Sequence, residues 1–478
     1  MTAWKVGASV LVTMVLTACS GGDPSIPVSP GAPPTTGPQN SAPTFHKDVE
    51  PILQDHCQGC HSPNNIAPFS LMTYADASPW AGPMVIQTSQ RLMPPWGAPT
   101  TSDCAPPLPW KNDNSLSDAQ IATIKAWSAA GAPEGDPHDA PAPKPPAPQA
   151  LDGVQLDLTP QQPFAASGGQ DEFRCFVLDP KAAALEYVNG IFFVAGNPKV
   201  VHHAVLISDP TGASASMADS TGGFDCFSFP ILPYEAILGV WAPGGTPIEL
   251  PSNIGTPIAP GGKLVLQVHY HPAGVTTAAP DLTHVQLRFT SSRPDYILIT
   301  SAVGNYPAPL PGGDGLQPGP GDPPTGPTFL IPANSNGHVE EMQLTIPAAI
   351  NGVAWPSVWL YGLMPHMHLA GQEIKVDLVK AGGTLGGQGD TCLLEDPNWR
   401  FAWQRFYAYD ATIAQLPMVG VGDKFRVRCV YDNTTDNQQL EASLKTTTNG
   451  IPVDIHLGEQ TTDEMCLAIP QLLIQNYL

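Results

Sequence analysis

Two kinds of side-chain cluster in this sequence have the types and spacing of reactive sites. The first is Cys57-Gln58-Gly59-Cys60-His61. In this C-x-x-C-H arrangement two thiols form thioether bonds with a haem, and the adjacent histidine ligates its iron. The spacing is specific enough to predict one covalent c-type haem on Cys57, Cys60 and His61.

The haem iron needs a sixth ligand, and a methionine thioether would raise its potential into the range used for electron transfer. Met93 is the predicted ligand, because it stands beside Pro94, which stiffens the loop, and lies between the haem motif and the next predicted helix. Met72 and Met84 are the alternatives. His46 and His56 are expected to be ordinary solvated helix residues.

The second kind of cluster consists of closely spaced histidines farther along the chain. Histidines separated by one residue share a face of a strand and can grip one metal ion. Adjacent histidines face opposite ways in a regular strand, so joint ligation would need a local twist or bulge. The chain has two pairs of the first type, His269 with His271 and His366 with His368, and one of the second, His202 with His203.

The metal is expected to be copper. One histidine on an apolar strand is more often structural than metal-binding, but here six of the 13 histidines lie in three tight clusters. Imidazole suits zinc, copper, iron and nickel, and a thioether added to two imidazoles favours Cu(I).

Two types of element must position these groups. Around the haem motif, apolar stripes predict a first helix over residues 45–53, with Thr44 as cap, and a second over 116–127. Residues 44–136 therefore resemble a small all-α monohaem cytochrome c. From about residue 150 onward, short alternating strands dominate and no long helix is predicted.

Composition agrees with this division. The 478 residues include 56 Pro and 45 Gly, and only 13% are charged, which disfavours helical bundles and favours secreted β-sandwich material. The net charge of −22 argues against nucleic-acid binding, which rests on basic phosphate contacts. A small-molecule or peptide substrate fits better.

The N-terminus indicates the compartment. Residues 1–18 read as a signal peptide with an apolar run too short to span a membrane. It ends at Cys19 in a context that resembles the bacterial lipobox, so Cys19 is the predicted lipid anchor. Residues 19–43 are a Pro-rich tether and residues 137–150 a second linker. We therefore expect a protein of the bacterial cell envelope that faces the periplasm or exterior. Its lipid anchor is the only expected attachment to the membrane, and the outer membrane is the expected location.

The ordered motifs of the second part resemble the copper type II monooxygenases typified by peptidylglycine α-hydroxylating monooxygenase and dopamine β-monooxygenase. The resemblance covers about residues 170–470. Its motifs are Phe173-Arg174-Cys175-Phe176, Val201-His202-His203, Leu266-Gln267-Val268-His269-Tyr270, His366-Met367-His368-Leu369-Ala370-Gly371 and Thr462-Asp463-Glu464-Met465-Cys466.

The resemblance implies two copper ions in two jelly-roll-like sandwiches, at residues 151–293 and 294–478. The electron-storing copper would bind His202, His203 and His269, and the oxygen-binding, catalytic copper would bind His366, His368 and Met465. His271 falls beyond the family's ligand position, and Gln267 resembles a residue near the site. The segment 307–327 has no counterpart and is expected to be a surface loop.

Disulfides follow from the same resemblance and from cysteine parity. The family implies Cys175 with Cys226 and Cys429 with Cys466. Cys104 and Cys392 are left over from the nine cysteines. They either bridge the haem domain to the second copper domain or stay unpaired with each other.

The function implied is hydroxylation of a substrate C–H bond with O2, with electrons from the attached haem, an ascorbate-like reductant or a protein donor. The alternative is a non-catalytic, lipid-anchored copper and haem redox or copper-binding protein. No G-x-S-x-G or comparable motif supports a hydrolase.

Overall fold

The fold is taken from a computed structural model of the chain. It describes residues 42–477 except for 64–66, 145–150, 168–171, 227–231, 233–235, 242–244, 271–278, 320–321, 351–352 and 385. The chain divides into two compact units, Met1–Ala42 and Pro43–Leu478. The predicted signal peptide, Cys19 and His271 lie outside the described residues. None of the described helices is both long and apolar enough to cross a membrane.

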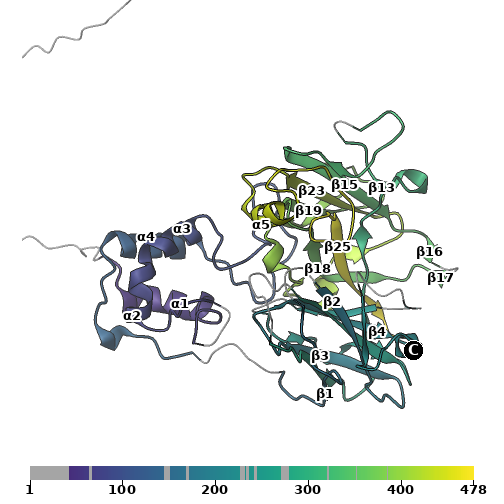
Figure 1. Cartoon of the computed structure of the whole chain (residues 1–478), viewed down its shortest axis with the longest axis horizontal. Coiled ribbons are helices and arrows are strands. Elements are labelled where there is room, and N and C mark those ends of the chain that lie inside the picture. Colours follow the sequence, from purple (N-terminus) through teal and green to yellow (C-terminus); the bar gives the residue numbers. More distant parts are fainter. Residues whose placement is uncertain are drawn as a thin grey trace, which may run out of the picture. The chain divides into compact units, whose positions relative to one another are not determined.

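A small helical cluster surrounds the C-x-x-C-H motif, and Figure 1 shows α1, α3 and α4 packed together. The apolar stripe of its first segment buries Phe45, Val49 and Leu53 against Ile124 and Trp127. The helices are η1 (Phe45–Val49), α1 (Glu50–His56), α2 (Tyr74–Ala77), η2 (Ser78–Trp80), α3 (Ala81–Ser89) and α4 (Asp118–Ala129).

The ends of these helices differ in how they are capped. Ser117 starts α4 with a capping box, because its side chain accepts from the Gln120 backbone and the Gln120 side chain accepts from the Ser117 backbone. Thr44 does not cap the first helix with its side chain. Its backbone N–H instead donates to Asp48 Oδ2 at 2.8 Å, so Thr44 stands at the expected N-cap position but makes no side-chain capping bond.

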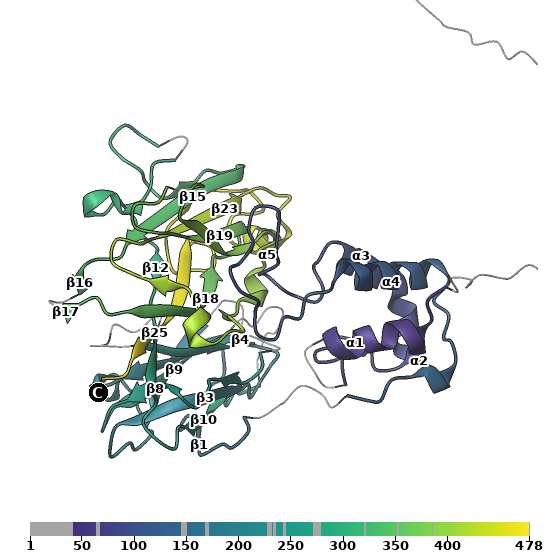
Figure 2. The same cartoon turned by 180° about the vertical axis from the view of Figure 1, so that it is seen from behind.

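The rest of the described chain is mostly β-sheet. One five-stranded sheet contains, in spatial order, β5 (Gly223–Asp225), β2 (Glu172–Leu178), β9 (Lys263–Tyr270), β4 (Val201–Asp209) and β6 (Ala236–Trp241). A second contains β13 (Gly315–Leu316), β15 (Asn336–Thr345), β23 (Lys424–Asp432), β19 (Gly371–Val379) and β20 (Asp390–Asp396). In Figure 2 the strands β15, β19 and β23 lie side by side.

A longer sheet backs both five-stranded sheets. Its main path contains β1 (Leu156–Leu158), β10 (His284–Phe289), β3 (Glu186–Val194), β8 (Ile254–Ile258), β11 (Tyr296–Thr300), β25 (Leu467–Gln475), β18 (Val358–His366) and β21 (Tyr407–Ala408). The short strands β7 (Ile248–Glu249), β12 (Val303–Gly304) and β22 (Met418–Val419) join it. Separate two-stranded ladders pair β14 (Leu330–Ile331) with β24 (Ile455–His456), and β16 (Ala349–Ile350) with β17 (Val353–Ala354).

Each five-stranded sheet buries its apolar face against part of the long sheet. In the first sandwich, Leu206 and Leu266 pack with Phe193 and Leu287, as alternating strand residues should. The second sandwich has its own large core. The long sheet passes from one sandwich to the other where β8 and β11 pair in parallel.

Two expectations for the second sandwich were wrong. Segment 307–327 contributes β13, whose Leu316 is buried in the core, so it is only partly a surface loop. The helix α5 (Gln438–Thr447) was not expected. Its Leu440 and Leu444 pack into the same core, and Asn437 caps it.

Candidate metal centres

The first candidate centre lies on two paired strands of the first sandwich. His203 on β4 is directly opposite His269 on β9, and the register shifts between Val201 and His203. This irregularity is the bulge that two adjacent histidines need to reach one site. The candidate ligand atoms of His202, His203 and His269 all lie within 4.8 Å of one another.

Packing orients the His269 ring, and burial favours the neutral form of His203. The His269 ring stacks on Phe173 with centroids 4.2 Å apart. Burial lowers the pKa of His203 well below its usual value, and the neighbouring His269 and His202 lower it further. A metal ligand must be an unprotonated imidazole, so the environment favours the form that binds metal.

The second candidate centre lies where β18 ends. His366 is opposite Leu467 of β25, two residues beyond Met465. The rings of His366 and His368 are 5.2 Å apart and perpendicular. Burial lowers the pKa of His366 to about 4 and that of His368 to about 3.

Hydrogen bonds orient both rings of this second centre. The Nδ1 of His368 lies 3.1 Å from the Asp463 carbonyl oxygen, which can only accept. The Nδ1 of His366 lies 2.6 Å from Gln404 Oε1, whose amide nitrogen donates to the Phe401 carbonyl. Both Nδ1 atoms therefore carry the proton, and the lone pair of each Nε2 can be donated to a metal.

Glu464 organises the turn beside this centre. Its fully buried carboxyl group accepts the backbone N–H groups of His368, Ala370 and Met465 at 2.6–3.1 Å. Burial raises the pKa of Glu464 to about 8, against the opposing effect of these donors. Tyr431 adds a hydrogen bond to the Met465 carbonyl at 2.7 Å.

Phe401 connects the two centres. Its ring stacks on His202 with centroids 4.9 Å apart and meets the edge of His368 at 5.8 Å. Phe401 is 8% exposed and lies in the short helix η6 (Phe401–Trp403). The histidines of the first and second sandwiches therefore face a shared aromatic side chain.

Haem attachment at the C-x-x-C-H motif stays a prediction, and the structure shows the state of its side chains. Of the described cysteines, six form the disulfides Cys175–Cys226, Cys429–Cys466 and Cys104–Cys392, whereas Cys57 and Cys60 form none. The Nδ1 of His61 lies 3.2 Å from the Phe69 carbonyl oxygen, so its Nε2 is available to a metal. Met93 follows α3 in a half-buried loop and lines a cavity of about 530 Å³, whose lining does not include Cys57, Cys60 or His61.

Sequence reasoning missed three residues that support these centres. Glu464 belongs to the motif of residues 462–466, but the motif does not show that the Glu464 carboxyl group accepts hydrogen bonds from backbone N–H groups. Phe401 and Gln404 carried no signal, because a lone aromatic or amide in a loop fits many roles. Gln267 is buried on β9, on the strand that carries His269.

A comparison with known proteins finds a distant relative of part of the chain. The chain is 25% identical over 285 residues to the human protein named "Putative DBH-like monooxygenase protein 2", which covers 57% of this chain. It spans about half of that relative, 46% of its length. This similarity supports a relationship with DBH-like monooxygenases.

Family profiles and solved structures do not assign the chain to a family. No protein-family profile matches the chain. A structure of allantoicase aligns over 55% of this chain and 78% of its own, with 12% identity and a TM-score of 0.15. The VP2 subviral particle of infectious bursal disease virus aligns over 68% and 72%, with 8% identity and a TM-score of 0.18.

Proposed function

We propose that this chain is a copper-dependent monooxygenase that hydroxylates a substrate C–H bond with O2. The observation that carries the proposal is the pair of histidine clusters, one in each sandwich, with Phe401 in contact with both. Copper bound there would supply one-electron chemistry and O2 binding.

The chain's own residues divide the work between the two centres. The first has three imidazoles within reach of one another, a closed set suited to storing an electron. The second has His366 and His368, and we assign Met465 as its third ligand. A thioether favours reduced copper, which suits the centre to O2.

We also propose that Cys57, Cys60 and His61 hold a covalent haem, with Met93 as the sixth ligand. The support is that these two cysteines are outside every disulfide of the described chain. The haem would donate electrons to the copper centres, and a small ascorbate-like reductant would be a second electron donor. Attachment in the same chain gives the donor a high effective concentration. Lipid anchorage through Cys19 in the bacterial envelope is part of the same proposal.

Oxygen consumption tests the function. Copper-loaded protein should consume O2 together with an ascorbate-class reductant when offered mixtures of small-molecule and peptide substrates, and a product should gain one oxygen atom from labelled O2. The matched control is His366→Ala, which should bind copper only at the first centre and consume none. If copper-loaded wild-type protein transfers electrons to added partners but never incorporates oxygen, the monooxygenase proposal fails and the hypothesis of a non-catalytic redox protein replaces it.

A further inference from the structure

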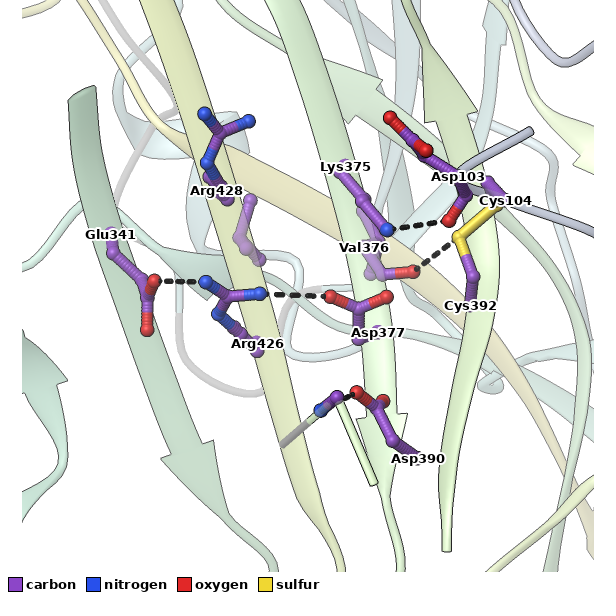
Figure 3. Close-up of polar contacts among 12 residues, drawn as sticks. Asp103, Cys104, Glu341, Lys375, Val376, Asp377, Asp390, Cys392, Arg426 and Arg428 are labelled. Atoms are coloured by element: carbon purple, nitrogen blue, oxygen red, sulfur yellow. Dashed lines mark hydrogen bonds and ion pairs between the residues drawn. A yellow bond between two sulfur atoms is a disulfide. The ribbon is translucent and has the colours of Figure 1, made fainter. Parts of the chain in front are cut away.

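The segment of residues 94–113, here called the strap, leaves the helical cluster after α3 and is attached to the second sandwich. Cys104 is bonded to Cys392 of β20 (Figure 3). Lys375 of β19 donates to the Asp103 carbonyl oxygen at 2.7 Å (Figure 3). The strap is therefore held by a covalent bond as well as by polar contacts.

Aromatic packing extends this attachment. Trp110 stacks on Tyr409 with centroids 4.6 Å apart and planes within 8°. Ala98 and Trp110 both belong to the core of the second sandwich. Lys111 Nζ donates to Tyr361 Oη at 2.8 Å. The strap is thus packed as part of the sandwich rather than lying loosely on its surface.

The start of the strap brings the predicted haem-ligand loop against β21. Trp96 is three residues after Met93, and its ring meets the Tyr407 ring edge-on at 5.1 Å. The Gly97 backbone N–H donates to Tyr407 Oη at 2.9 Å. A Cβ on Gly97 would overlap the carboxyl group of Asp396, so a larger residue here would have to displace that side chain.

Tyr407 is connected in turn to the second candidate copper centre. It pairs with Leu363 of β18, the strand that ends at His366. Three residues before Tyr407, Gln404 accepts the hydrogen bond of His366 Nδ1 at 2.6 Å. Short stretches of backbone and one hydrogen bond therefore join the Tyr407 ring to a predicted copper ligand.

Arg405 lies at the same junction. Its guanidinium carbon is 5.0 Å from the Trp96 ring centre and 5.6 Å from that of Tyr407. Arg405 therefore contacts both aromatic rings of this junction.

We propose that Trp96, Tyr407 and Gln404 form the route by which electrons pass from the haem domain to the His366 centre. This inference rests on the proposed function. With haem and copper bound, each transfer would move one electron, so that ferrous haem would become ferric and Cu(II) would become Cu(I), with no bond or proton changed. An ascorbate-class reductant would return the haem to the ferrous state. Tunnelling weakens steeply across empty space, so ring contact, backbone and a hydrogen bond make a continuous route.

The test is anaerobic flash reduction of full-length protein that carries haem and Cu(II). A photogenerated flavin radical delivers less than one electron per chain, and absorbance follows the haem while freeze-quench EPR follows Cu(II). In wild-type protein, reduced haem should reoxidise as the Cu(II) signal falls. Trp96→Leu and Tyr407→Leu should each slow reoxidation about tenfold or more, whereas Trp96→Phe and Tyr407→Phe, which retain a ring, should stay within about threefold.

Controls separate the route from general damage. Trp359→Leu removes an aromatic ring that packs on Tyr296 in the same sandwich and should leave the rate unchanged. Haem content, copper content, thermal unfolding and the Cys104–Cys392 crosslink should be the same in all variants that are compared. Unchanged reoxidation in both Leu variants overturns the route.

The proposed function fails in a different way. If wild-type protein passes electrons from haem to copper, yet no reductant-dependent oxygen incorporation occurs, the route stands and the monooxygenase proposal falls. If oxygen incorporation occurs with a small reductant but reduced haem never reoxidises anaerobically, the monooxygenase stands and the route falls.

Discussion

The two candidate copper centres are built in different ways. The first is positioned by strand pairing: His203 faces His269 across the β4–β9 ladder, and one bulge brings in His202. The second depends on groups distant in sequence, because Gln404 and the Asp463 carbonyl orient its histidines.

This difference shows where each centre is vulnerable. Backbone hydrogen bonds along a ladder hold the first centre in place even when one side chain near it changes. Loops around β18 and β25 hold the second, so substitutions of residues that never touch metal should alter it. Outer contacts of this kind commonly change metal affinity by about 10–100-fold.

The largest expected effect is loss of one centre without the other. His203→Ala should remove the copper of the first centre and leave the second loaded, and His368→Ala should do the reverse. Each variant should bind one copper per chain where wild-type protein binds two, as measured by metal analysis and EPR. Loss of both coppers in either variant would show that the centres are not independent.

The strap disulfide offers the next contrast. Cys104 and Cys392 are 288 residues apart, whereas Cys175 and Cys226 are 51 apart. In the loop-entropy account the longer loop stabilises more, by roughly 6 kcal/mol against roughly 4 kcal/mol. Cys104→Ser with Cys392→Ser should therefore cost more in denaturant unfolding than Cys175→Ser with Cys226→Ser. The opposite ranking would mean that the crosslink adds little to the non-covalent contacts that already hold the strap on the sandwich.

Buried carboxyl groups distinguish the two sandwiches by pH. In the first, burial raises the pKa of Asp209, but hydrogen bonds from Ser214 and Thr211 outweigh this and lower it below its usual value. In the second, burial raises the pKa of Asp396 to about 7. The folded state therefore binds the Asp396 proton more tightly than the unfolded state does.

The contribution of Asp396 to the free energy of unfolding is fully present below pH about 4 and is lost as the pH rises to about 7. Asp396→Asn, which resembles the protonated form, should gain roughly 2–4 kcal/mol over wild-type protein at pH 8 and nothing at pH 3.5. Asp209→Asn is the matched control and should instead lose stability at neutral pH. Denaturant unfolding across this pH range measures both, and a pH-independent gain for Asp396→Asn would contradict the assignment.

The smallest effect expected concerns Glu464. Glu464→Ala would leave the N–H groups of His368, Ala370 and Met465 without their buried acceptor. Copper affinity should fall about 10–100-fold at the second centre and stay unchanged at the first. Competitive copper titration resolves the two, and equal weakening of both centres would show global damage instead.

The sequence predicted the parts of the molecule that follow local patterns. Alternating strands indicated mostly β-structure, and the sequence required a bulge at His202 before joint ligation with His203. The cysteine pairs Cys175–Cys226 and Cys429–Cys466 form as the family resemblance implies. For Cys104 and Cys392, the structure shows the bridge and not the unpaired alternative.

The rest depends on contacts between residues far apart in the chain. Trp96 and Tyr407 are separated by about 300 positions, and no periodicity or motif links them. The same is true of Gln404 and His366, because an amide in a loop is compatible with many partners. Helix α5 was missed because its apolar residues, Leu440 and Leu444, are few and its surroundings are polar.

X-ray absorption of the fully reduced, copper-loaded protein measures the ligands of both proposed copper centres at once. We expect two coppers per chain, one with only nitrogen neighbours from His202, His203 and His269. The other should show a sulfur neighbour that disappears in Met465→Leu. Zinc at full occupancy in protein matured with copper, or a copper spectrum unchanged by Met465→Leu, would contradict the proposal of two different copper centres.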